Sequence, residues 1–149
     1  MTKMERCEMA KQAHESGLNC AQAVLAAFTD ITGLTAEQSM AIAGGFGGGM
    51  SCGGICGVVS GCVAVLGAAC PHTRENGAAG KQRVKHLAQE FQRRFTQQFR
   101  HLNCRELLAD QELEGTAAAC ELGVTHHCRM LVVSGVELLC DMLAELEAQ

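Results

Sequence analysis

Two short segments of the chain, residues 18–22 (LNCAQ) and 102–106 (LNCRE), place a cysteine in nearly the same local sequence. In each, an Asn stands where a helix N-cap is expected, the cysteine takes the first helical position, and Gln or Glu takes the third. The helix dipole and the unpaired N–H groups at such a start favour a thiolate over a thiol. Thiolates attack disulfides and bind metals, so Cys20 and Cys104 indicate redox or metal chemistry.

Two further cysteines also lie near expected helix starts. Cys56 follows a run of glycines at the start of an apolar segment, and Cys128 comes three residues after the candidate N-cap Thr125. The N-termini of packed helices can converge on one point, where four thiolates would need positive compensation from helix dipoles or a metal ion. Four cysteines can ligate an iron–sulfur cluster or a zinc ion, and two dithiols could instead cycle through disulfides.

The spacing of the cysteines excludes several common motifs. The chain contains no C-x2-C, which argues against zinc-ribbon, thioredoxin-like and bacterial-ferredoxin sites, and without C-x-x-C-H no haem is expected. Cys52 and Cys56 form C-x3-C; if one helix covers both, they share a face and could chelate a soft ion such as Cu(I). Cys52 therefore stays a candidate metal ligand beside Cys56.

The other cysteines and the nearby histidines have more ordinary explanations. Apolar helical surroundings predict structural thiols, because free cysteine packs as a small hydrophobe. This applies to Cys62, Cys70 and Cys140, whereas Cys7 is expected to be incidental and Cys120 stays undecided. His126 and His127 point in different directions on a helix, so at most one can join a site at Cys128. His101 is likewise close to Cys104 in sequence, and for these histidines an exposed side chain is the ordinary outcome.

Composition sets the broad class of the protein. The chain has 149 residues, nearly half of them hydrophobic, which fits a single domain over 1–149. The net charge of −4 gives no attraction to nucleic acid, and no segment is convincing as a membrane span. Without a signal peptide the chain is expected in the cytoplasm, where a reducing environment argues against ten structural half-cystines and favours ligands, catalytic thiols or inert thiols.

The elements that must position the cysteines are expected to be helices. With no Trp or Tyr, a single Pro, and apolar residues at helical spacing, the sequence predicts an all-α bundle without sheet. Helices are expected over 2–16, 19–32, from Thr35 onward, 55–69, 81–101, a short stretch from Cys104, and 125–147, with connections at 71–80 and 109–119. A glycine-rich loop over 44–54 should precede the central buried helix and turn its N–H groups toward an anion such as a thiolate or a cluster.

Two features also suggest association with a second copy. The last helix carries an apolar stripe from Leu131 to Leu146, and residues 40–70 contain no charged side chain. We expect that a chain of this size does not cover the stripe alone, and together with the uncharged segment this predicts a homodimer formed through helix packing.

The order of these pieces resembles a family of bacterial redox-active proteins named for the pattern Cys, Gly-Cys-Ala-x-x-Gly, Cys, Cys. The matching segments span most of the chain, and the middle one departs from the named motif, since Ile55 precedes Cys56 and Gly57-Val58 follows it. These segments are Asn19-Cys20-Ala21, residues 44–50, residues 56–61, residues 103–108 and Cys128. The resemblance implies a small helical redox protein of anaerobic or facultative bacteria. It also implies a relation to part of a split-Soret-type cytochrome, in which an iron–sulfur centre accompanies haem.

Three hypotheses about function follow. The first is an electron carrier in which four cysteines ligate an iron–sulfur cluster and pass electrons to a partner protein; these are Cys20, Cys56, Cys104 and Cys128, with Cys52 as the alternative to Cys56. The second is a metal-free thiol–disulfide oxidoreductase that uses some of the same cysteines. The third is a binding module for Cu(I) or Zn(II). No Ser-His-Asp order or paired carboxylates support a hydrolase.

Overall fold

Nine α-helices and one π-helical turn make up the regular structure, and no strand is present, so the all-α expectation is confirmed. The computed structural model describes all residues from Met1 to Gln149. The α-helices are α1 (Lys3–Glu15), α2 (Cys20–Ala26), α3 (Thr29–Thr32), α4 (Ala36–Ala43), α5 (Gly57–Ala69), α6 (Gly77–Phe99), α7 (Cys104–Ala109), α8 (Ala117–Glu121) and α9 (His127–Glu147). The π-helical turn η1 spans Gly49–Gly53.

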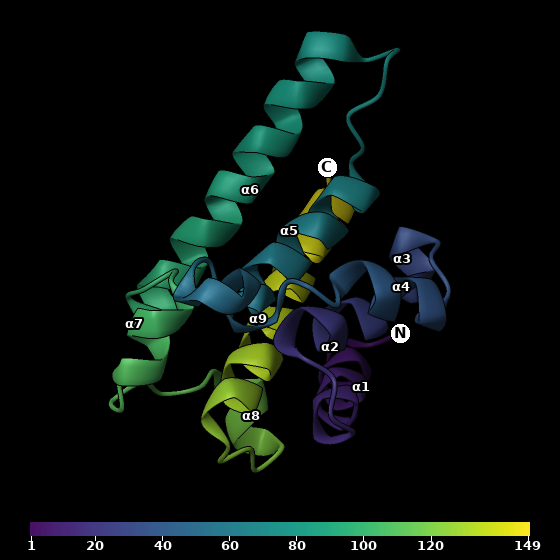
Figure 1. Ribbon diagram of the computed structural model, residues 1–149. Coiled ribbons are helices and arrows are strands. Elements are labelled where there is room, and N and C mark those ends of the chain that lie inside the picture. The colour runs from purple at the N-terminus through teal and green to yellow at the C-terminus, as the bar shows by residue number, and fades with distance from the viewer.

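The core forms where α5 and α9 pack together, with α1 and α2 on one side and the second half of α6 on the other (Figure 1). Twenty-eight buried hydrophobic residues form one cluster across these helices. Only the second half of α6 contributes large side chains to it, through Phe91, Phe95 and Phe99, while its first half leans away from the bundle. The apolar spacing expected for this helix therefore serves the core mainly over its last three turns.

The first part of the apolar stripe of α9 is covered by the chain itself. Leu131, Val132, Val136 and Leu139 are at most 2% exposed, because α1, α5, α6 and α8 pack around this helix. These residues therefore offer no surface to a second copy, whereas Leu143 and Leu146 near the end of the stripe are half-buried. The homodimer stays a prediction that rests on this end of α9 and on the charge-free segment 40–70. None of the helices is both long enough and apolar enough to cross a membrane.

The helix expected over 19–32 is divided in two. The backbone leaves the helical region at Phe28, whose φ is −135° and whose side chain is fully buried. The Ala27 carbonyl, which would continue the helix, accepts a hydrogen bond from Arg6 Nη1 of α1 at 2.7 Å instead. The guanidinium also lies 4.7 Å from the centre of the Phe28 ring. A contact with α1 thus ends α2, while the expected stop at Gly33 is confirmed by its left-handed φ of 74°.

Other boundaries differ by a few residues. Helix α6 begins at Gly77 rather than at 81, so residues 77–80 are helical rather than part of the connection. The N-cap of α9 is His126 and not Thr125: the His126 Nδ1 atom accepts a hydrogen bond from the Arg129 backbone N–H at 3.2 Å. The connection expected over 109–119 overlaps the short helix α8.

The glycine-rich segment folds as a compact left-handed turn. Gly48, Gly49, Met50 and Ser51 all have φ near 60°, a region that residues with a Cβ rarely adopt. A Cβ at Gly49 would lie 2.3 Å from the Gly54 carbonyl oxygen, so this turn requires glycine there. The turn η1 lies shortly before α5, where a glycine-rich loop was expected to precede the central helix.

Candidate functional site

Two of the candidate cysteines are brought together by a short antiparallel pairing of the chain. The Cys56 N–H donates to the Leu102 carbonyl at 2.8 Å, and the Cys104 N–H donates to the Gly54 carbonyl at 2.7 Å. These bonds flank the bridge between Ile55 and Asn103. Because side chains alternate in extended chain, Cys56 and Cys104 lie on the side of the pairing opposite to the bridged pair. The start of α7 is thereby fixed to the start of α5.

A glycine holds the start of α2 against the same point. A Cβ at Gly57 would lie 3.1 Å from the Ala21 backbone nitrogen and 3.0 Å from the Phe46 carbonyl oxygen. One turn further along α5, a Cβ at Gly61 would lie 3.1 Å from Cβ of Val24. These small residues let α5 and α2 approach closely at their N-termini. Cys20 and Cys56, the residues just before Ala21 and Gly57, become neighbours.

The start of α9 completes the arrangement. His127 lies 2.7 Å through Nε2 from the Leu107 carbonyl, and since a carbonyl only accepts, Nε2 carries the proton. This bond ties α9 to α7. The next residue, Cys128, interacts with Cys20: the Cys20 side chain lowers the pKa of Cys128, and Cys128 raises the pKa of Cys20, which is the pattern of a thiol that donates toward a thiolate. Electrostatic coupling also links Cys128 to both Cys56 and Cys104. The four thiols therefore share one neighbourhood built from four helix starts.

The thiols differ in their affinity for protons. The hydrogen bond from Cys20, helped by the charge of His127, lowers the pKa of Cys128 to about 6. The same hydrogen bond, together with burial, raises the pKa of Cys20. Burial raises the pKa of Cys56 to about 11, although the backbone N–H groups of two following residues oppose it. Burial and the charge of Cys128 raise the pKa of Cys104. A helix start was expected to favour a thiolate at Cys20 and Cys104, but the pKa of both is raised. The interaction with Cys128 is the main cause at Cys20, and burial is the main cause at Cys104.

The family model that matches the chain is described as "Putative redox-active protein (C_GCAxxG_C_C)", and it aligns with residues 18–142. The chain belongs to this family. Comparison with curated proteins and with solved structures found no match. The match begins just before Cys20 and ends beyond Cys128, so the four cysteines all lie inside the matched part of the chain.

Cys52, the alternative middle cysteine of this redox-family chain, lies in the turn η1 and not at the start of α5. It is exposed within η1, and its Sγ atom donates to the Gly49 carbonyl at 3.3 Å. Arg105 Nη2 donates to the backbone carbonyl of Cys52 at 3.2 Å. Cys52 and Cys56 do not share a helix face, because one lies in the π-helical turn and the other precedes α5. The condition for chelation of a soft ion by this pair is therefore not met.

The cysteines outside the group have separate surroundings. Cys62 is fully buried, as its structural assignment predicts, and its thiol donates to the Gly135 carbonyl of α9 at 3.7 Å. Cys7 is also fully buried and donates to the Val133 carbonyl at 3.8 Å, so it is a core residue and not an incidental one. Cys70 is half-buried and Cys120 is exposed.

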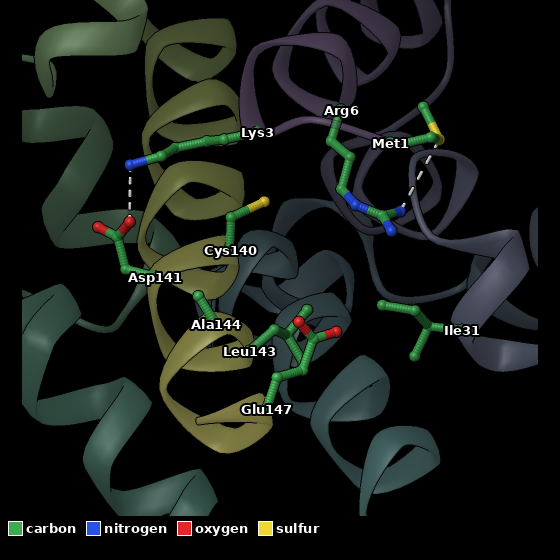
Figure 2. Close-up of a pocket in the computed structure, with 9 residues that line it drawn as sticks. All are labelled: Met1, Lys3, Arg6, Ile31, Cys140, Asp141, Leu143, Ala144 and Glu147. Atoms are coloured by element: carbon green, nitrogen blue, oxygen red, sulfur yellow. Dashed lines mark hydrogen bonds and ion pairs between the residues drawn. The ribbon is translucent and has the colours of Figure 1, made fainter. Parts of the chain in front are cut away.

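Cys140 occupies a different part of the fold from the four thiols. It lines a cavity of about 230 Å³ between α1 and α9, together with Arg6 and Asp141 (Figure 2). The polar groups around it are already satisfied: Lys3 pairs with Asp141 at 2.7 Å, and Arg6 pairs with Asp30 at 2.7 Å. Burial raises the pKa of Cys140 to about 11, which keeps it a thiol at neutral pH. Cys140 thus provides a control for changes to the four-thiol group.

Two residues at the site have no signal in the sequence. His14 lies in the last turn of α1, with Nε2 at 4.0 Å from the Cys20 sulfur. Its Nδ1 atom lies 3.2 Å from Nε of Arg129, one residue beyond Cys128. Burial, followed by the charge of Arg129, lowers the pKa of His14. By contrast, His101 pairs with Asp110 at 2.9 Å rather than with Cys104.

The donor chemistry and the arrangement of the group give different indications about a metal. Four thiols are soft donors of the kind that iron–sulfur clusters, zinc and Cu(I) take. Nevertheless, no group of three or more His, Cys, Asp or Glu side chains is arranged so that it could hold a metal ion. The closest functional association in the metal-free chain is the pair formed by Cys20 and Cys128.

Proposed function

We propose that this member of the redox-active family is a thiol–disulfide oxidoreductase that works through Cys20 and Cys128. The observation that carries the proposal is the interaction of these two side chains, through which Cys20 lowers the pKa of Cys128 to about 6 while its own pKa is raised. At neutral pH one member of the pair is a thiolate and the other a protonated thiol. The thiolate attacks a disulfide, and the protonated thiol then resolves the mixed disulfide.

The proposed step transfers two electrons to the disulfide of a partner protein. The Cys128 thiolate attacks one partner sulfur, breaks the partner's S–S bond and releases one partner thiolate, which leaves a mixed disulfide. Cys20 then gives up its proton to a released partner sulfur and attacks Cys128. The Cys20–Cys128 disulfide forms and the second partner sulfur leaves. The dithiol is oxidised, the partner disulfide is reduced to one thiol and one thiolate, and the total charge is unchanged.

An iron–sulfur cluster is the second candidate, favoured by the two further thiols in the same neighbourhood. Cys56 and Cys104 are not needed for a single dithiol, yet the chain pairing at Ile55 and Asn103 brings both to Cys20 and Cys128. To hold a cluster, which supplies one-electron transfer to a partner protein when bound, these four cysteines would have to take up a closer arrangement than they have in this structure. Because ligation needs thiolates, binding would release protons from the cysteines whose pKa is raised.

One pair of variants separates the two candidates. Cys104→Ser removes one of the four thiols but leaves the Cys20–Cys128 pair intact, whereas Cys20→Ser removes both functions. After strictly anaerobic purification, iron and acid-labile sulfide are measured, and oxidation of the metal-free protein is followed by peptide mass spectrometry. The dithiol proposal expects Cys104→Ser to form the Cys20–Cys128 disulfide like the wild type, without iron in either protein.

Iron and sulfide in the wild type that disappear in Cys104→Ser would favour the cluster instead. Cys140→Ser is the matched control, because that thiol is half-buried and lies at another cavity of the fold. It should retain both disulfide formation and any bound iron. If the metal-free wild type forms no Cys20–Cys128 disulfide, the dithiol proposal is wrong.

A further inference from the structure

A directed chain of hydrogen bonds leads to the cysteine pair from outside the family's cysteine pattern. The Arg129 guanidinium can only donate, so the 3.2 Å contact from its Nε makes His14 Nδ1 an acceptor. In the neutral ring the proton must then lie on Nε2, the atom 4.0 Å from the Cys20 sulfur. His14 therefore presents a donor to Cys20, and Cys20 in turn donates to Cys128. Each link points the same way, from the guanidinium toward the thiolate.

The position of the His14 ring is fixed from more than one side. His14 belongs to α1, which packs along α9, and Arg129 comes from the first turn of α9. The ring of His126, the N-cap of α9, meets the His14 ring edge-on with the centroids 5.5 Å apart. The imidazole is thus held between the helix start that carries Cys128 and the one that carries Cys20. A ring constrained in this way keeps its donor aimed at sulfur.

We propose that His14 is a positioning residue that raises the reduction potential of the Cys20–Cys128 pair, and that Arg129 acts by fixing the proton of the imidazole on Nε2. The inference rests on the proposed dithiol function. The reduced pair carries a negative charge shared between two sulfurs, whereas the disulfide is neutral and its sulfurs are weaker acceptors. A hydrogen bond to Cys20 consequently stabilises the reduced form more than the oxidised form, as donors to thiolates do in general.

The test is the equilibrium of the metal-free protein with reduced and oxidised glutathione. In this equilibrium, the protein disulfide and two molecules of reduced glutathione react to give the protein dithiol and glutathione disulfide. His14→Leu removes the donor, while His14→Gln keeps an N–H in a similar position. For His14→Leu we expect the disulfide to be favoured roughly three- to tenfold more than in the wild type. A tenfold change corresponds to a potential about 30 mV lower. His14→Gln should restore at least half of the shift.

Equal shifts in His14→Leu and His14→Gln, or no shift in His14→Leu, would overturn the inference. Arg129→Met should shift the equilibrium in the same direction by a smaller factor, since the imidazole then keeps its ring but not its fixed tautomer. His72→Leu, an exposed histidine remote from the pair in sequence, should match the wild type. The thermal midpoint of each variant separates a change in potential from a change in fold. If the wild type shows no Cys20–Cys128 couple at all, the proposed function fails, an outcome distinct from a couple that is insensitive to His14.

Discussion

The two Leu-Asn-Cys segments begin helices by different means, although their sequences are nearly the same. At α2, Asn19 Oδ1 accepts from the Gln22 N–H at 2.8 Å, and Gln22 returns a bond to the Asn19 N–H at 2.9 Å, which completes a capping box. At α7, the side chain of Asn103 makes no capping bond and instead donates to the Glu106 carboxylate at 3.1 Å. The expected box is therefore confirmed at the first segment and wrong at the second.

The difference lies in what surrounds each Asn. The Asn19 amide also donates to the Ala43 and Gly44 carbonyls, at 3.3 and 3.2 Å, so the glycine-rich segment holds it in the capping position. The backbone of Asn103 is engaged in the bridge to Ile55, and this pairing sets the start of α7 without a side-chain cap. A capping sequence thus states a local preference, and tertiary contacts decide whether the preference is used.

The largest expected difference between the two segments is in what their cysteines do to the pKa of Cys128. Cys20→Ala removes the hydrogen bond that lowers it, so the pKa should rise from about 6 toward the ordinary thiol range. Cys104→Ala removes no donor to Cys128, so the pKa should stay near 6. The pH dependence of alkylation by iodoacetamide, located at Cys128 by mass spectrometry, measures both. Reactivity in the wild type should rise with pH through about 6, because the thiolate is the reactive form. Equal midpoints in the two variants would contradict the pairing.

The next effect concerns the close approach of α5 to α2, the helix that begins at the first Leu-Asn-Cys segment. Gly57→Ala places a Cβ 3.0 Å from a backbone oxygen of Phe46, and a backbone neighbour gives way only at a cost of about 1–3 kcal/mol. Gly67→Ala, in the same helix, meets nothing within 4 Å and should be neutral or stabilising by up to about 1 kcal/mol. Urea unfolding monitored by circular dichroism compares them. A Gly57→Ala protein as stable as Gly67→Ala would show that α2 and α5 can separate freely.

The two Asn residues themselves should differ in their contribution to stability. Asn19→Ala loses the cap and the bonds to the glycine-rich segment, and we expect a loss of about 1–2 kcal/mol. Asn103→Ala keeps the backbone bridge and loses one exposed bond, which should change stability by less than about 0.5 kcal/mol. Unfolding midpoints in urea measure the pair. Similar losses in both variants would mean that the bridge does not replace the cap.

The smallest effect is expected at the third helical position of each segment. Gln22→Ala removes the return bond of the box and a bond from Nε2 to the Met40 carbonyl at 2.8 Å, so we expect a loss of about 1 kcal/mol. Glu106→Ala removes only exposed contacts, to Asn103 and to His101, and should cost less than about 0.5 kcal/mol. Thermal midpoints at low salt check the ranking, and a larger loss for Glu106→Ala would reverse it.

The sequence predicted what local patterns determine. The all-α class, the cap at Thr35 and the stop at Gly33 follow from composition, spacing and residue type, and all three are present. The end of α2 could not be predicted, because it depends on Arg6, a residue about 20 positions away that captures the Ala27 carbonyl. Elements were thus predictable where their causes lie within a few residues.

At the candidate site, the helix-start argument selected four cysteines whose charges act on one another in the fold, and their role as a site stays a prediction. The protonation of these cysteines could not be predicted, since burial and the Cys20–Cys128 bond arise only when the helices pack. His14 and Arg129 carry no motif and meet across 115 positions of the chain, so nothing in the sequence joins them. Second-layer contacts of this kind come from packing and not from local pattern.

The short antiparallel pairing between the segments that carry Cys56 and Cys104 has a consequence for the order of folding. The two bonds beside the Ile55–Asn103 bridge close a loop of roughly 50 residues, a closure whose entropy cost must be met before the contact contributes. Contacts so distant in sequence are expected late in folding, after α5 and α6 have formed. Until then the cysteines have no common environment, and an oxidant meets ten separate thiols. The exchange rate of the Cys56 and Cys104 amide protons would report when the centre exists and how often it opens.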